Sequence, residues 1–249
     1  MLLQADAKQL EWVGATYFSQ DKVAMQEIWD GVDQHADNQD RFGLPSRLIA
    51  KTFVFRLIYG GSAYSYAHDP NFRDIGNEVF WQKIIDKFYK KYEGLQKWHD
   101  LILFKAKKAC RLVMPTGRTY YYEPEIKHDK AYWPRTKILN YPVQGLGADL
   151  MAIARVSLRN RLQNMSPLFY KEYEGIKLVN TIHDSIILDF DTKVWDNSSI
   201  VNLVDNCFSD IPKNFKKLFG YPFNLPMRVE CQIGPSWGEM EIINANINN

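Results

Sequence analysis

Residues 177–190 are the stretch that most restricts how this chain can fold. Two apolar, β-branched runs flank a polar His-Asp-Ser segment at His183, Asp184 and Ser185. Such runs joined by a short polar segment predict a β-hairpin. The hairpin would carry the carboxylate of Asp184 at its tip.

A second carboxylate lies near the start of the chain. Met1 to Ala5 predict a short strand that ends at Asp6, and the apolar pattern that follows is helical. A carboxylate between a strand and a helix is a familiar place for a metal ligand, although an isolated Asp is also a common helix cap. Two carboxylates converging on two divalent ions about 3.5–4 Å apart are a recurring device for phosphoryl transfer.

Residues 47–60 predict a helix with an unusual face. Pro45 and Ser46 supply start signals, and Gly60 with Gly61 supplies the stop. Spacings of four residues place four side chains within roughly 120° of one another: Arg47, Lys51, Phe55 and Tyr59. Two cations followed by two rings suit a surface that holds a phosphate chain at one end and a flat ring at the other. An ordinary amphipathic surface helix is the alternative.

A longer helix is expected after Pro142, because apolar residues recur from Leu146 to Leu162. Asn140 and Gln144, near its start, carry amides suited to the minor-groove acceptors of DNA, which are nearly the same for every base pair. Helix capping is the alternative role for both amides. A hairpin is also expected around Thr116-Gly117.

Composition narrows the class of protein. Hydrophobic residues make up 46% of the 249 residues and charged residues 24%, which is typical of a globular protein. Residues 105–137 hold nine lysines and arginines against three acids, interleaved with tyrosines, as single-stranded nucleic-acid binding or a solvated surface would require. The three separated cysteines exclude a Cys-paired zinc site. No run approaches eighteen apolar residues, so we expect a cytoplasmic protein without a membrane partner.

Four segments resemble the family A DNA polymerases, in the family's order. Residues 6–11 are similar to the first polymerase motif, and the Arg-x3-Lys-x7-Tyr-Gly pattern of residues 47–60 resembles the fingers helix. Residues 140–149 resemble the Asn-x-Pro-x-Gln-Gly-x-x-Ala-Asp motif, and residues 183–185 resemble the His-Asp-Glu motif.

This resemblance implies an α+β fold with an antiparallel palm sheet, long helices and a mostly helical fingers subdomain, which is the right-hand polymerase fold without its thumb. Residues 1–20 would be palm, 21–134 fingers and 135–249 palm again. The implied reaction is template-directed transfer of deoxynucleotides to a primer 3′-OH, with two Mg²⁺ ions for which Mn²⁺ can substitute. The implied partners are primer-template DNA and dNTPs.

The resemblance also assigns roles residue by residue. Metal ligands would be Asp6, Asp184 and the backbone carbonyl of Ala7. Lys51 would protonate the leaving pyrophosphate, and Glu11 would exclude a ribose 2′-hydroxyl. The nucleotide would be bound by Gln9, Glu11, His35, Arg47, Lys51, Phe55 and Tyr59. DNA would be bound by Gly60, Arg118, Arg135, Asn140, Gln144 and His183.

Several positions depart from the family pattern. Lys8 replaces a small residue, Val13 stands where the family has Arg, and Ser185 replaces the Glu of the His-Asp-Glu motif. Asp189 or Asp191 could substitute for that Glu, although no spacing supports either. Phe55 lacks a phenol hydroxyl, which predicts poor use of dideoxynucleotides. Trp237, in a C-terminal segment that also resembles the family, is interpreted as a packing residue.

Three wider interpretations follow. Because Met1 lies so close to the first motif, the chain is expected to be either a piece of a larger protein or one chain of a split enzyme, and the split enzyme is favoured. Its partner chain would carry the thumb, the remaining palm and an optional exonuclease, and such gene splitting suggests a phage or other mobile genome. A single-subunit RNA polymerase shares the fingers pattern and a His-Asp-Ser turn, but Glu11 and residues 140–149 argue against it. A non-catalytic nucleic-acid-binding subunit is the third possibility, supported by the replaced Ser185 and Val13.

Overall fold

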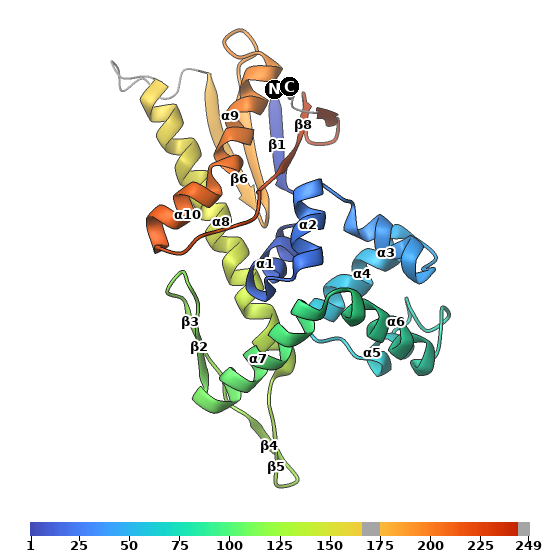
Figure 1. Ribbon diagram of the computed structural model, residues 1–249. Helices are drawn as coiled ribbons and strands as arrows, with labels where there is room; N and C mark the ends of the chain where they lie inside the picture. Colours follow the sequence, from blue (N-terminus) through green and yellow to red (C-terminus); the bar gives the residue numbers. More distant parts are fainter. Residues whose placement is uncertain (166–174, 244–249) are drawn as a thin grey trace. The chain divides into compact units, whose positions relative to one another are not determined.

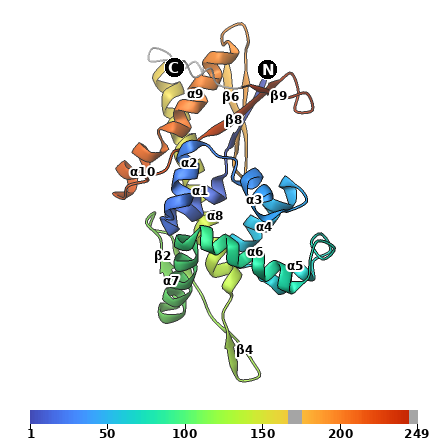
Figure 2. The ribbon, with the colours of Figure 1, turned by 45° about the vertical axis from the view of Figure 1, so that its right-hand side comes forward.

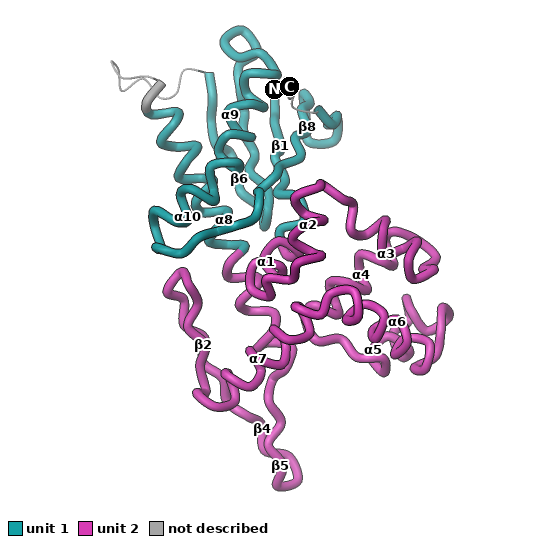
Figure 3. The backbone as a smooth tube through the Cα atoms, viewed as in Figure 1, with its two compact units in different colours: residues 1–10, 147–249 teal, residues 11–146 magenta. Residues whose placement is uncertain are grey.

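The computed structural model describes residues 1–165 and 175–243 and divides into two compact units. Unit 1 comprises residues 1–10 and 147–249, and unit 2 comprises residues 11–146 (Figure 3). The predicted palm and fingers boundaries at residues 20 and 134 stay predictions, and residues 244–249 of the last predicted segment lie outside the described residues.

Unit 1 is built on a five-stranded sheet in the order β6-β7-β1-β8-β9 (Figure 1). Every neighbouring pair is antiparallel, so the predicted α+β class with an antiparallel sheet is confirmed. The strands are β1 (Leu2–Ala7), β6 (Ile176–Ile182), β7 (Ser185–Phe190), β8 (Val229–Gly234) and β9 (Glu241–Ile243).

The two faces of the central strand β1 differ. Leu3, Ala5 and Ala7 are buried, whereas Gln4 and Asp6 are half-buried, because successive side chains of a strand point to opposite faces. One face of β1 therefore contributes to the core, and the other presents polar groups. The predicted hairpin is confirmed as β6 and β7.

Helices of unit 1 run beside this sheet in both views (Figures 1 and 2). They are the C-terminal half of α8 (Arg135–Met165), α9 (Asn197–Ser209) and α10 (Ile211–Phe219). Helix α9 buries Ile200, Val204 and Phe208, which recur at spacings of four residues and form one apolar stripe. That stripe supplies much of the helical side of the core.

The start of α8 corrects the sequence prediction. The helix was expected to begin after Pro142, but it begins at Arg135 and contains Pro142. Proline has no N–H to donate to the carbonyl four residues earlier, here that of Ile138, yet the remaining bonds of the helix can form around one missing bond. Asn140 and Gln144 consequently lie within the helix, one turn apart on one face, so neither caps its N-terminus.

Unit 2 is mainly helical, as the fingers prediction expected. Its helices are α1 (Leu10–Ser19), α2 (Lys22–Asp30), α3 (Gln34–Phe42), α4 (Arg47–Ile58), α5 (Ala63–Ala67), α6 (Glu78–Lys91), α7 (Glu93–Ala109) and the first part of α8. Among the described residues, no helix combines the length and the apolar character needed to cross a membrane.

An aromatic core holds the helices of unit 2 together. The ring centroids of Phe53 and Trp81 are 5.8 Å apart, and those of Tyr66 and Trp81 are 5.2 Å apart. The Tyr66 hydroxyl donates to the Phe53 carbonyl at 2.8 Å, which satisfies the polar end of a fully buried ring. Phe53 belongs to the buried stripe of α4, and the predicted phosphate-binding cations lie outside that stripe.

Two small hairpins complete unit 2. Strands β2 (Arg111–Val113) and β3 (Thr119–Tyr121) form the hairpin predicted around Gly117, whose φ of 84° suits glycine. Strands β4 (Glu125–Lys127) and β5 (Lys130–Tyr132) form a second hairpin, fully exposed, that projects from the helices of this unit (Figure 2).

Candidate functional site

The carboxylate of Asp6 is surrounded by hydrogen-bond donors. Asp6 lies directly opposite Ser185 of β7 and Glu230 of β8, so the three side chains share one face of the sheet. The Ser185 hydroxyl donates to Oδ1 of Asp6. The Gln4 amide Nε2 donates to Oδ2 at 2.9 Å and lies 3.3 Å from Oδ1. Two different side chains therefore hold this carboxylate.

Asp184 lies at the same end of the sheet as Asp6. The backbone N–H of Ala7 donates to the carbonyl of Asp184 at 2.9 Å, which ties the turn of the β6–β7 hairpin to the end of β1. His183 in this turn is exposed and has a φ of 49°, a strained conformation for a residue with a Cβ. Strain of this kind often occurs at functional sites.

These groups have the chemistry that a hard divalent cation requires. No group of three or more His, Cys, Asp or Glu side chains that could hold a metal occurs within residues 1–165 and 175–243. Mg²⁺ does not need one, since it is commonly bound by one or two carboxylates together with water and substrate phosphates. Asp6, Asp184 and the carbonyl of Ala7 offer only oxygen ligands and so fit this pattern.

Glu230 is a carboxylate that sequence reasoning missed. It lies opposite Asp6 on β8, and one of its oxygens is 3.9 Å from Nζ of Lys8. Only the strand register places it there, and the sequence did not predict that register. Asp189, offered earlier as a substitute acid, instead lies opposite Leu2, four residues away along β1. The structure gives neither Asp189 nor Asp191 a place beside Asp6.

In unit 2, helices α3 and α4 bring four predicted nucleotide-binding residues together. The ring of His35 on α3 lies 5.4 Å from the ring of Phe55 on α4, edge to face. Nζ of Lys51 is 5.6 Å from the Phe55 centroid. Arg47, one turn before Lys51, is exposed. We call these four residues the cationic face.

His35 is kept neutral by its surroundings. Its pKa is lowered to about 4, first by burial and then by the charge of Arg47, with a smaller contribution from Lys51, while Asp33 opposes them. The ring is only 3% exposed, and within the described residues its Nδ1 has no hydrogen-bond partner. A neutral imidazole with an unsatisfied nitrogen can accept or donate one hydrogen bond, depending on its tautomer.

Arg47 is paired with an acid that sequence reasoning did not single out. Its Nε donates to Oδ2 of Asp33 at 2.7 Å, and Oδ1 of Asp33 accepts from the backbone N–H groups of His35 and Ala36 at the start of α3. Burial alone would raise the pKa of Asp33, but the bonds from Arg47 and from these N–H groups lower it below 3.8.

Tyr59 at the end of α4 connects that helix to α8 within unit 2. Its hydroxyl accepts a hydrogen bond from Gln144 Nε2 at 2.6 Å. Burial and then the negative charge of Glu11 raise the pKa of Tyr59, so the phenol keeps its proton. Glu11, Tyr59 and Gln144 therefore form one polar group.

Arg135 is the first residue of α8, and the predicted DNA-binding residues Gly60 and Arg118 belong to segments that pack against this helix. Gly60 has a φ of 88°, and a Cβ there would lie 2.9 Å from Leu139 and 3.1 Å from Arg135. A Cβ on Gly145 would clash with the Tyr120 hydroxyl of hairpin β2–β3 and lie 3.3 Å from Arg118. Both glycines allow a neighbouring segment to pack closely on α8.

The predicted site residues thus fall into two groups. Asp6, Ala7, Gln9, Asp184 and His183 belong to unit 1, and Gln9 has a left-handed φ of 55° in the turn after β1. All the other predicted residues belong to unit 2. Asn140 is half-buried on α8, on the same face as Gln144.

The two residues after Glu11 belong to the core of unit 2. Val13 is 3% exposed, and Trp12 is 1% exposed, with its ring 5.0 Å from Tyr92 and 6.3 Å from Phe88. An arginine at position 13 would bury a charge. The replacement by Val is therefore compatible with this apolar site.

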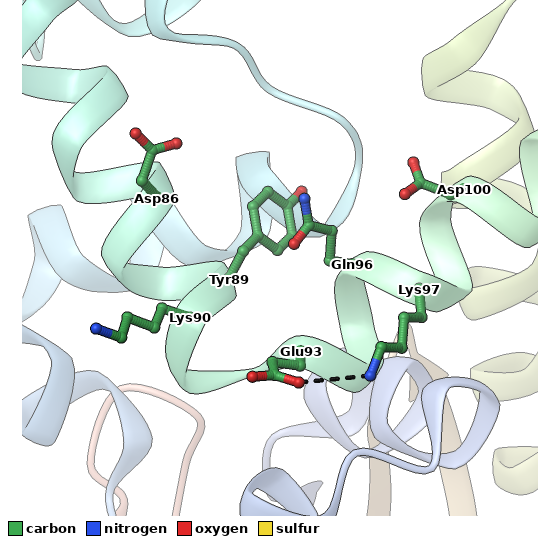
Figure 4. A pocket seen from close by; sticks show the side chains of 7 residues that line it. All are labelled: Asp86, Tyr89, Lys90, Glu93, Gln96, Lys97 and Asp100. Carbon is green, nitrogen blue, oxygen red and sulfur yellow. Dashed lines mark hydrogen bonds and ion pairs between the residues drawn. The ribbon is translucent and has the colours of Figure 1, made fainter.

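A polar hollow elsewhere in unit 2 contains none of the predicted residues (Figure 4). It lies between the end of α6 and the start of α7, and its acids and lysines carry opposite charges. Lys97 pairs with Glu93 at 3.4 Å, and the Tyr89 hydroxyl lies 3.0 Å from Nδ1 of His99. The lining residues are Asp86, Tyr89, Lys90, Glu93, Gln96, Lys97 and Asp100.

Comparison with known proteins identifies the family. The sequence-family model described as DNA polymerase family A matches residues 1–239. The chain belongs to DNA polymerase family A. The suspected resemblance is therefore confirmed over nearly the whole chain.

Individual polymerases show how far the similarity extends. A thermostable DNA polymerase I of Thermus aquaticus is 23% identical over 95% of this chain and 27% of its own length. DNA polymerase I of Pseudomonas aeruginosa is 26% identical over 96% of this chain and 25% of its own length. The chain thus spans about a quarter of the length of these relatives.

A solved structure confirms the fold. The POL domain of Pol1 from M. smegmatis, in complex with DNA primer-template and dNTP, matches with a TM-score of 0.73. The match covers 95% of this chain and 40% of that chain at 19% sequence identity. The antiparallel sheet and the helical unit are thus those of a polymerase domain.

Proposed function

We propose that this chain catalyses template-directed DNA synthesis as the palm and fingers part of a family A DNA polymerase. The observation that carries this proposal is the pair of acids at one end of the sheet, Asp6 on β1 and Asp184 in the turn tied to Ala7. Family membership supplies the context, and the cationic face supplies groups for a triphosphate.

Unit 1 contributes the carboxylates for catalysis. Asp6, Asp184 and the carbonyl of Ala7 would hold two Mg²⁺ ions, which when bound lower the pKa of a primer 3′-OH and neutralise the triphosphate. The donors from Gln4 and Ser185 fix the orientation of Asp6 before the substrates arrive. Such preorganisation avoids a cost of rearrangement during the reaction.

Unit 2 contributes the groups for the triphosphate. Arg47 can present a planar fork to phosphate oxygens and Lys51 a compact charge. Lys51 would also protonate the leaving pyrophosphate. His35, kept neutral, can offer one hydrogen bond to a phosphate oxygen without adding a third charge. Phe55 would face the sugar, and its lack of a hydroxyl is expected to disfavour dideoxynucleotides.

The polar group around Tyr59 suits the base and sugar of the nucleotide. Glu11 would leave no room for a ribose 2′-hydroxyl, and Tyr59 would stack near the templating base. Asn140 and Gln144 would contact minor-groove acceptors, and Gln144 would have to leave Tyr59 to do so. The DNA backbone would be contacted by Gly60, Arg118, Arg135 and His183.

Full activity is proposed to need further polymerase residues. The chain corresponds to about a quarter of its curated relatives. We propose that the thumb and the remaining palm residues of a family A polymerase act together with the residues of this chain.

Primer extension tests the proposal. The chain, alone and mixed with candidate partner polypeptides, is supplied with Mg²⁺, primer-template DNA and either deoxy- or ribonucleotides. We expect deoxynucleotide extension in a mixture, and its loss by about a thousand-fold in Asp184→Asn. Asp189→Asn is the matched control, because it removes a carboxylate from β7, the strand that follows Asp184, at the end far from Asp6. Equal activity of both variants would refute the metal assignment.

A second variant tests the sugar selectivity. Glu11→Ala is expected to admit ribonucleotides by removing the side chain that blocks the 2′-hydroxyl, and the ratio of kcat/KM values for the two sugars measures it. Unchanged selectivity would remove this role from Glu11. Ribonucleotide use by the native chain would favour the RNA polymerase interpretation.

A further inference from the structure

A row of hydrogen bonds on one face of the unit 1 sheet leads from a tryptophan to the Asp6 carboxylate. The Trp237 indole Nε1 donates to Oε1 of Gln4 at 2.7 Å, and Gln4 Nε2 donates to Oδ2 of Asp6 at 2.9 Å. On the other side, the Ser185 hydroxyl donates to Oδ1 of Asp6. We call Trp237, Gln4 and Ser185 the Asp6 clamp.

The loop between β8 and β9 brings Trp237 to Gln4. Its turn is closed by the backbone N–H of Glu239, which donates to the carbonyl of Ser236 at 3.1 Å, and by the Ser236 hydroxyl, which donates to Oε2 of Glu239 at 2.9 Å. The Trp237 side chain is 54% exposed, so the sequence-based interpretation of Trp237 as a packing residue misses its most specific contact.

The indole determines which end of the Gln4 amide faces Asp6. An amide can present either its oxygen or its NH₂ group to a neighbour, whereas an indole nitrogen is only a donor. Because Trp237 requires an acceptor, the oxygen of Gln4 must face it, and the NH₂ group is then directed at the carboxylate. Without the indole, the amide could rotate and place its oxygen against the negative charge of Asp6.

The clamp leaves Asp6 free to bind a cation. Each carboxylate oxygen has two lone pairs. Ser185 occupies one on Oδ1, and Gln4 occupies one on Oδ2 at 2.9 Å and also makes a longer contact of 3.3 Å to Oδ1. Oδ2 therefore retains a further lone pair for a cation, and the plane of the carboxylate is fixed. Partners that orient a metal ligand in this way commonly change metal affinity or activity 10- to 100-fold when they are removed.

We propose that Trp237, Gln4 and Ser185 are positioning residues that hold the Asp6 carboxylate ready for a divalent cation. This inference rests on the proposed function for the identity of Asp6 as a ligand. It also gives the family departure Ser185 a role, because a hydroxyl that donates to Asp6 stands where an ionised Glu would repel the Asp6 carboxylate.

Direct cation binding tests the clamp without requiring polymerase activity. Free Mn²⁺ is measured by electron paramagnetic resonance during titration of the full chain. Gln4→Met keeps the side-chain length but removes the donor, and is expected to weaken Mn²⁺ binding about tenfold. Ser185→Ala is expected to do the same, and Trp237→Phe to weaken it roughly two- to tenfold, the value of one hydrogen bond.

A double-variant cycle separates positioning from general damage. Trp237 acts on Asp6 through Gln4 in this proposal, so Trp237→Phe should have no effect on Mn²⁺ affinity in a chain that already carries Gln4→Met. Gln232→Met is the matched control, because Gln232 lies opposite Gln4 on β8 and shares its face. Gln232→Met should bind Mn²⁺ like the native chain.

Three results would overturn the inference. The first is native Mn²⁺ affinity in Gln4→Met and Trp237→Phe, and the second is additive losses in their double variant. The third is native affinity in Asp6→Asn, which would also remove Asp6 from the proposed reaction. By contrast, clamp-dependent Mn²⁺ binding in a chain that never extends a primer would support the clamp while the proposed function fails.

Discussion

Helix α3 makes two ion pairs with other helices, and the two differ in exposure. At its start, Asp33 pairs with Arg47 of α4 at 2.7 Å, and the side chains are 44% and 55% exposed. One turn later, Asp37 pairs with Lys91 of α6 at 2.6 Å. The Lys91 side chain is only 10% exposed and that of Asp37 is 31% exposed, and Lys91 also contacts Glu27 at 2.7 Å.

The less exposed pair, Asp37 with Lys91, belongs to a cluster of contacts that stabilises unit 2. Nζ of Lys91 lies 4.6 Å from the Tyr92 ring, and the Tyr92 hydroxyl donates to the second oxygen of Glu27 at 2.7 Å. Lys91 and Glu27 each have two polar partners, and Asp37 also pairs with Arg41 at 3.3 Å, so every charged group in this cluster is satisfied from more than one side. Removing one partner of such a group leaves uncompensated charge, which costs several kcal/mol.

The exposed pair between Arg47 and Asp33 can be broken at little cost. Water screens the attraction between Arg47 and Asp33, and such surface pairs contribute about 0.2–1 kcal/mol. A triphosphate, with several negative oxygens, can therefore displace the single carboxylate from Arg47. Under the proposed function, the less exposed pair would hold the fold, and the exposed pair would keep Arg47 in position until a nucleotide binds.

The largest expected effect is on the buried cluster. Lys91→Met keeps the length of the side chain but leaves Glu27 and Asp37 without their shared cation, and should lower the free energy of unfolding by about 3 kcal/mol. Chemical denaturation measures it. Lys97→Met on α7 is the matched control, because Lys97 is 78% exposed and its pair with Glu93 should contribute less than about 1 kcal/mol. Equal losses of unfolding free energy in Lys91→Met and Lys97→Met would contradict the comparison of the two ion pairs.

Much of this arrangement could be predicted from sequence. The strand ending near Asp6, the hairpin with Asp184 at its turn and the helix that begins at Arg47 follow from local patterns, because β-branched runs, caps and glycine stops act over a few residues. The family motifs then assigned roles to Arg47, Lys51 and His35. The structure adds that these three lie together with Phe55.

Other features depend on contacts between distant segments and were missed. Glu230 shares a face with Asp6 only through strand register, and Trp237 reaches Gln4 only through the turn after β8. The start of α8 was misplaced because Pro142 is a start signal in isolation, yet packing keeps it inside a longer helix. The low exposure of Lys91 likewise could not be predicted, because lysine is usually exposed and Lys91 is the last residue of the amphipathic helix α6.

An intermediate effect is expected at His35, which lies on α3 between the two aspartates. Its folded pKa of about 4 is below the ordinary 6.5, through burial first and then Arg47 and Lys51, against Asp33. The folded state therefore binds a proton at His35 less readily than the unfolded state does. The free energy of unfolding is not reduced by His35 above pH 6.5, and it decreases as the pH falls from 6.5 towards 4. His99, with a pKa lowered to about 3 by burial and by Arg135, should add a similar loss.

Unfolding free energies measured from pH 7 to 4 test this expectation. In His35→Asn the slope against pH should decrease by up to about 1.4 kcal/mol per pH unit, the contribution of one proton. His99→Asn should remove a second such contribution, and the double variant both. A native slope in His35→Asn would show that His35 is free to charge in the folded protein and could bind phosphate as a cation.

The smallest effect should come from Asp33→Asn, and it tests the comparison most directly. Asparagine remains a good N-cap, so the bonds to the N–H groups of His35 and Ala36 can persist while the charge that competes for Arg47 is lost. We therefore expect unchanged stability and a KM for dNTP that is lower by about two- to fivefold, as an exposed pair of up to 1 kcal/mol allows.

Asp37→Asn makes the same change one turn later and should instead destabilise unit 2. A raised KM in Asp33→Asn would mean that Asp33 orients Arg47 for the nucleotide. A loss of stability equal to that of Asp37→Asn would mean that both pairs are scaffold.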